Sequence, residues 1–155
     1  MNGYVVSRRK PKEMNQINTS AIIVKIENAA LNHHLADLEH WINKLDLSDQ
    51  LELHRHLSRN ALQIIREQRH QLAVNDGVKE HIIWYELSNQ PWSDAVLVET
   101  IAIYQETSWV AMESIVLVAL KQNKATAQQV RHIGDVFASE EVTRQIQRWK
   151  ERQGL

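Results

Sequence analysis

The chain has 155 residues, of which 43% are hydrophobic and 24% charged, and its formal net charge is −1. This composition is typical of a soluble globular protein long enough to form a hydrophobic core. The absence of cysteine excludes disulfides, thiolate zinc sites and thiol catalysis, and it fits a cytoplasmic location. The near-neutral charge gives no general attraction to nucleic acid, so any such binding depends on local basic patches.

The first 18 residues are predicted to form a flexible basic arm. Four basic side chains surround Pro11: Arg8, Arg9, Lys10 and Lys12. No apolar run follows them, which argues against a secretory signal. Such an arm can lie on DNA phosphates or in a groove, or it can be a disordered, solubilising start. Residues 19–155 are expected to form a single helical domain, because 4 Gly and 2 Pro leave few tight turns.

A first helix is predicted over residues 19–45, with Thr19 or Ser20 as its N-cap. His33, Asp37 and His40 share one flank of this helix at a spacing that could surround a metal ion. A solvated flank explains the same three residues more simply. We therefore predict no metal site and no cofactor.

A second helix is predicted over residues 48–74. Its polar face carries an arginine stripe, which could bind phosphate or an acidic protein partner: Arg55, Arg59, Arg66 and Arg69. The alternative is an intramolecular face paired with Glu52 and Glu67. Polar residues also fall on the apolar arcs of these two helices and could form a buried hydrogen-bonded network: Glu27, His34, His54 and Gln68.

A short helix over residues 78–88 precedes a long apolar segment over residues 93–122. Glu99, Glu106 and Glu113 recur every seven residues in this segment and keep it shorter than a membrane span. We expect one long central helix, buried in the molecule or in a dimer. A bend near Thr107 and Ser108 would split it into two.

Residues 115–155 follow the order of a helix-turn-helix module. Thr126 with Gln129 forms a capping-box pattern, and Ser139 begins a further helix. The expected fold is therefore all-α, with five to seven helices. It comprises a helical bundle over residues 19–122 and a tri-helical module over residues 115–155.

This module resembles the helix-turn-helix of winged-helix transcription regulators, most closely the MarR-like group. The residues that carry the resemblance are the apolar run from Ile115 to Leu120, then Thr126, Val130, Ile133 and Gly134, and finally Val142, Thr143, Arg144, Gly154 and Leu155. In that family the last helix enters the major groove of DNA. The resemblance implies DNA contacts from Thr143, Arg144, Gln145 and Arg148, with Gln128, Arg131 and His132 near the phosphate backbone.

Two functions remain open from the sequence. The first is a small regulatory protein that binds double-stranded DNA as a homodimer. The second is a non-enzymatic adaptor or inhibitor that binds a protein partner through the arginine stripe or a tryptophan surface formed by Trp41, Trp84, Trp92, Trp109 and Trp149. No phosphate loop, nucleophile elbow or paired-carboxylate motif is present, so no catalytic residue is predicted.

Overall fold

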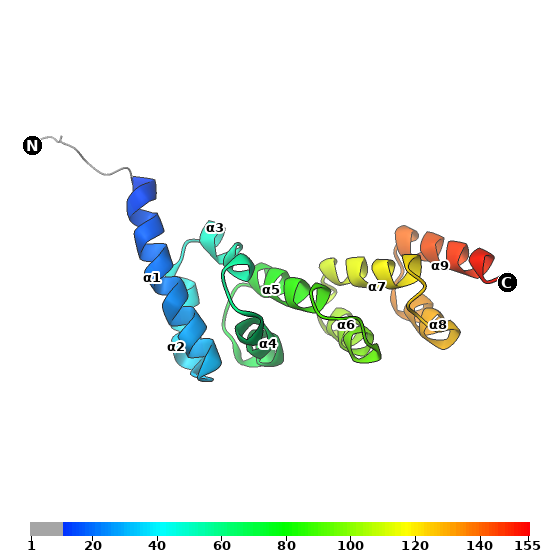
Figure 1. The fold of residues 1–155 in the computed structure, drawn as a ribbon, viewed down its shortest axis with the longest axis horizontal. Coiled ribbons are helices and arrows are strands. Elements are labelled where there is room, and N and C mark those ends of the chain that lie inside the picture. The colour runs from blue at the N-terminus through cyan, green and yellow to red at the C-terminus, as the bar shows by residue number, and fades with distance from the viewer. Residues whose placement is uncertain (1–10) are drawn as a thin grey trace, which may run out of the picture. The chain divides into compact units, whose positions relative to one another are not determined.

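The computed structural model describes residues 11–155, in which every regular element is a helix (Figure 1). The described part of the chain contains nine α-helices and two short 3-10 helices, which confirms the all-α class. The chain divides into two compact units, Met1–Glu86 and Leu87–Leu155. The basic residues Arg8, Arg9 and Lys10 lie outside the described residues.

The first unit contains the helices α1 to α5. Their bounds are α1 (Pro11–Leu31), α2 (Leu35–Lys44), α3 (Leu47–Gln50), α4 (Arg59–Glu67) and α5 (Asp76–Ser88), with 3-10 turns at Leu53–Arg55 (η1) and Arg69–Gln71 (η2). Because α1 already begins at Pro11, the predicted N-cap at Thr19 or Ser20 is wrong. Proline is favoured in the first turn of a helix, where its missing N–H costs nothing.

Breaks divide both of the long helices predicted in this unit. His33 has a positive φ of 56° and separates α1 from α2, which then packs back against α1. Ser58 caps α4, where its Oγ accepts a hydrogen bond from the N–H of Ala61 at 3.1 Å. The predicted helix over residues 48–74 is thus replaced by α3, η1, α4 and η2.

The core of the first unit draws on every one of its longer helices. Its largest fully buried side chains are Ile26, Leu38, Ile42, Leu53, Ile65, Ile82 and Ile83. Helix α1 contacts both α2 and α4. Glu27 of α1 reinforces the second contact by accepting hydrogen bonds from the backbone N–H and the hydroxyl of Ser58.

The second unit contains α6 (Asp94–Thr107), α7 (Ala111–Lys121), α8 (Ala127–Val136) and α9 (Glu140–Arg152). The expectation of one long central helix is wrong, because the chain reverses at Ser108. This residue has a left-handed φ of 57°, and its N–H donates to the carbonyl of Tyr104 at 2.8 Å. The bend near Thr107 and Ser108 is the alternative that the structure supports, and α6 and α7 pack against each other.

The last two helices, α8 and α9, begin where the capping signals predict. Thr126 and Gln129 form both hydrogen bonds of the capping box at the start of α8. Ser139 caps α9 by accepting from the N–H of Val142 at 3.1 Å. Side chains from all four helices form the core of the second unit, including Leu97, Val116, Leu120, Val130, Ile133, Phe137, Val142 and Trp149. Within residues 11–155, no helix is both long and apolar enough to cross a membrane.

Candidate nucleic-acid interface

Helix α9 has one buried face and one exposed face. Val142, Gln145 and Trp149 are buried, at a spacing that places them on one side of a helix. Thr143, Arg144 and Arg148 are exposed. The apolar face therefore holds α9 against the unit, and most of its charged residues face solvent.

Helix α7 packs against α9, and we call three basic residues of these helices the basic cluster: Lys121 at the end of α7, and Arg144 and Arg148 on α9. All three cations act on Glu141, with which Arg144 forms an ion pair. The pKa of Glu141 lies below its usual value, first because Gln145 Nε2 donates to Glu141 Oε2 at 3.0 Å, and then because of these three cations. One carboxylate thus faces three positive charges, and the cluster keeps a net positive charge.

Gln145 is the exception among the side chains predicted to contact DNA from α9. It is 3% exposed, and its amide donates to Glu141. This burial leaves Gln145 almost no surface with which to contact DNA. Its role is to fix the position of a carboxylate within the basic cluster. Thr143 remains exposed and donates its hydroxyl to the carbonyl of Ser139 at 3.0 Å.

The residues predicted on α8 lie on two different sides of that helix. Gln128 and His132 line a groove between α6 and α8. Arg131 lines a separate cleft between α8 and α9, which Lys150 and Trp149 also line. Only Arg131 therefore lies next to the helix that carries the basic cluster.

Charge is unevenly distributed along the second unit. Residues 121–155 contain seven Lys and Arg against four Asp and Glu, a formal charge of +3. Residues 87–120 contain four Asp and Glu and no Lys or Arg, a formal charge of −4. The end of the unit built by α8 and α9 is therefore the part suited to a polyanion, although Glu140 and Glu151 are exposed on α9.

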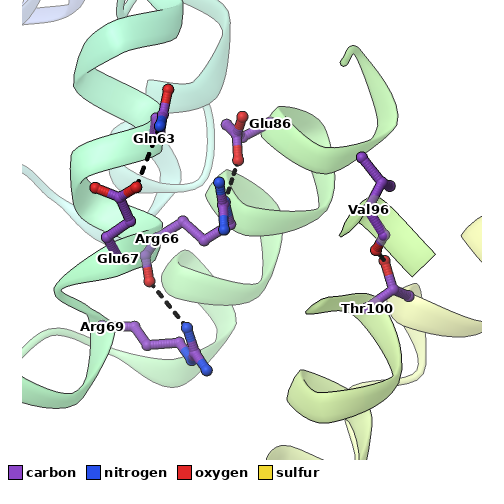
Figure 2. A network of polar contacts seen from close by, with 7 residues as sticks. All are labelled: Gln63, Arg66, Glu67, Arg69, Glu86, Val96 and Thr100. Carbon is purple, nitrogen blue, oxygen red and sulfur yellow. Dashed lines mark hydrogen bonds and ion pairs between the residues drawn. The ribbon is translucent and has the colours of Figure 1, made fainter. Parts of the chain in front are cut away.

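The arginine stripe predicted in the first unit does not form a continuous surface. Arg66 pairs with Glu86, and the two side chains are 12% and 1% exposed. Arg69 donates to the backbone carbonyl of Arg66 at 3.1 Å, as Figure 2 shows. Arg55 is exposed, and its Nη1 lies 3.3 Å from Glu52 Oε1. Arg59 is exposed at the start of α4. Two of the four arginines thus serve the packing of the first unit.

The tryptophans do not form a broad exposed surface either. Trp149 is buried, and the other four are each partly buried. Trp41 packs against the core of the first unit, with the ammonium of Lys25 4.8 Å from the centre of its ring. Trp92 packs against the core of the second, where Lys124 lies 5.9 Å from its ring.

The histidines lie differently from the predicted buried network. His33, Asp37 and His40 are exposed, and in the part of the chain that the structure describes no group of three or more possible ligands could hold a metal. His34 is also exposed, and Glu27 is occupied by Ser58, so the network of these residues with His54 and Gln68 is not formed.

Only His54 of that predicted network is buried, with 7% of its surface exposed. The centre of its ring lies 5.0 Å from that of Tyr85 and 5.9 Å from that of His81, both on α5. Its Nδ1 has no hydrogen-bond partner. Its position on an apolar arc was the sequence signal for this burial.

Two features of the second unit were not predicted from the sequence. Lys121 is the last residue of α7, and only packing brings it near α9. The groove between α6 and α8 likewise exists only because these two helices lie next to each other in the folded chain. No known family model matches this chain, and no curated protein and no solved structure is significantly similar to it.

Proposed function

We propose that the protein is a DNA-binding regulatory protein and that its second unit binds the duplex through α9 and the end of α7. The basic cluster is the observation that carries this proposal. Lys121, Arg144 and Arg148 all lower the pKa of Glu141, and that one carboxylate does not cancel their three charges. Guanidinium groups pair with phosphate oxygens through two parallel hydrogen bonds.

The phosphate backbone supplies most of the affinity in this proposal. A formal charge of +3 over residues 121–155 favours a polyanion at this end of the unit. Thr143 adds an exposed hydroxyl one residue before Arg144, and Arg131 adds a cation beside α9. Side chains of these types position a protein on a duplex through phosphate and sugar contacts.

Dimerisation is the second part of the proposal. A regulator that binds two half-sites needs two copies of its module. Val110 and Val118 are 70% and 44% exposed and are separated by about two turns of α7, so they supply apolar surface for a symmetric contact. Sedimentation at several protein concentrations measures this association, and Val118→Glu is expected to weaken it.

A duplex-retention experiment tests the DNA contact. The full chain is applied to immobilised duplex DNA, and the salt concentration is raised stepwise. We expect binding to weaken steeply with salt. The double variant Arg144→Ala with Arg148→Ala should bind weakly, and its salt dependence should be shallower by about two phosphate contacts.

The matched control is Arg55→Ala with Arg59→Ala, which removes two exposed arginines from the first unit and leaves the basic cluster intact. This control is expected to bind DNA like the unaltered chain. Equal loss in both double variants would mean that total charge, and not the basic cluster, governs retention. Unchanged retention of the Arg144 and Arg148 variant would reject the proposed contact outright.

A further inference from the structure

A groove of about 570 Å³ lies between α6 and α8, away from the basic cluster. Leu97, Val98, Ile101 and Ala102 form its apolar floor along α6. The groove follows this helix from Asp94 to Gln105, a distance of roughly 17 Å at the usual rise of an α-helix. A segment of three helical turns has the same length.

The floor of the groove is accessible to a partner. Val98 is 65% exposed although it lies beside the buried Leu97 and Ile101, and Ala102 is exposed as well. When a partner covers a solvent-exposed valine and its small apolar neighbours, the free energy of the system falls.

The rim consists mainly of uncharged polar groups. Gln105, Gln128 and Gln129 supply amides, and His132 supplies an imidazole. The amide of Gln129 also donates to Asp94 Oδ1 at 2.9 Å, which ties the start of α8 to the start of α6. This hydrogen bond joins the two walls of the groove at one end.

The formal charge within the lining of the groove is negative. Asp94 is the only Asp, Glu, Lys or Arg in its lining. Helix α6 also carries Glu99 and Glu106, and residues 87–120 contain no Lys or Arg. A complementary partner therefore has cations beside its apolar contacts.

We propose that this groove binds one basic amphipathic helix of another protein. Apolar residues of that helix, spaced three and four apart, cover Val98 and Ala102. Its lysines and arginines lie beside the acidic residues of α6. Binding of an amphipathic helix in a groove is a common mode of peptide recognition. The inference assigns a protein-binding site that is separate from the basic cluster and from the arginine stripe.

None of the helices that the structure describes, Pro11–Arg152, is suited to be the partner helix. A second copy of α6 would bring the same acidic residues, Asp94, Glu99 and Glu106, against the groove. Among the described α-helices, only α4 and α9 have more basic than acidic residues. Both already bury their apolar faces in their own units, through Ala61, Leu62 and Ile65 in α4 and through Val142 and Trp149 in α9.

Two synthetic peptides test the proposal on the full chain. Each has about fourteen residues, which spans three to four helical turns, and leucines three and four apart. The first carries lysine at the remaining positions and the second carries glutamate. Fluorescence anisotropy measures their affinities, and amide chemical shifts of the protein locate the site. We expect the lysine peptide to bind at least about tenfold more tightly than the glutamate peptide and to shift residues of α6 and α8.

Ala102→Trp fills the groove and is expected to lower the affinity for the lysine peptide by at least about tenfold. Ala36→Trp adds the same side chain at an exposed helical position that does not line the groove, and it should leave binding unchanged. The double variant Arg144→Ala with Arg148→Ala should bind the peptide normally. Failure of DNA binding and failure of this site are therefore distinguishable.

Three results would overturn the inference. Neither peptide binds, or both bind equally well, or Ala102→Trp has no more effect than Ala36→Trp. Sedimentation supplies a further criterion: a dimer of the unaltered chain that Ala102→Trp dissociates would assign the groove to a second copy.

Discussion

Arg66 and Glu86 illustrate how a charged residue can belong to the interior of this protein. Arg66 is on α4 and Glu86 is on α5, and they form an ion pair where little of either side chain reaches water. Figure 2 shows Arg66 directed at the carboxylate of Glu86. A buried charge that loses its partner retains the cost of its desolvation. The pair therefore constrains how these two helices pack.

At this scale we predict that Glu86→Ala destabilises the first unit by about 3 to 5 kcal/mol, because it removes the Glu86 carboxylate from a guanidinium that little water reaches. The double variant Arg66→Met with Glu86→Leu is expected to recover most of that loss. Denaturant unfolding of the purified variants measures both effects. A single substitution costing no more than the double would contradict this account of the pair.

At the scale of elements, helix caps and breaks determine where each helix ends. Ser58, Ser93, Thr126 and Ser139 each accept a hydrogen bond from a backbone N–H in the first turn of the following helix. A serine or threonine cap commonly stabilises a helix by about 1 kcal/mol. The breaks at His33 and Ser108 depend on left-handed backbone conformations. At each break the chain changes direction, so that α1 packs against α2 and α6 packs against α7.

His54 gives a prediction for the packing of η1 against α5. Its pKa is lowered from the ordinary value of 6.5, first by burial and then by the positive charges of His81 and Arg55. Glu52 and a hydrogen bond to the Leu51 backbone favour the charged form but do not offset these effects, and Tyr85 contributes a ring contact. The folded first unit therefore favours the neutral imidazole.

The His54 imidazole binds a proton at a higher pH in the unfolded chain than in the folded chain. The contribution of neutral His54 to the free energy of unfolding should therefore be fully present above pH 6.5 and fall as the pH drops below that value. We expect the free energy of unfolding of His54→Phe to depend less on pH over this range. Urea unfolding at a series of pH values measures the dependence. An identical pH dependence in the variant would show that other groups cause it.

At the scale of the whole molecule, two hydrophobic clusters within residues 11–155 support helices of different units. One core includes Leu38 and Ile65, and the other includes Ile133 and Trp149. The two clusters share no residue. The candidate interface for DNA and the α6 and α8 groove are both built on the second core.

We therefore predict that core substitutions act within one unit. Leu38→Ala and Ile133→Ala each remove a fully buried side chain and should cost about 2 to 5 kcal/mol. Amide hydrogen exchange is expected to rise in the first unit for Leu38→Ala and in the second for Ile133→Ala. A loss of protection across the entire chain in either variant would indicate that the units unfold together.

The amino-acid sequence was enough to predict the all-α class, the starts of α8 and α9 and the burial of Val142 and Trp149 on α9. These features depend on local physics, namely helical periodicity and capping side chains. The folded chain was needed to show that Gln145 is buried, that Arg66 pairs with Glu86 and that Lys121 lies within electrostatic reach of α9. Each of these depends on which face of a helix meets another helix, and that choice follows from packing over many residues and not from the local pattern.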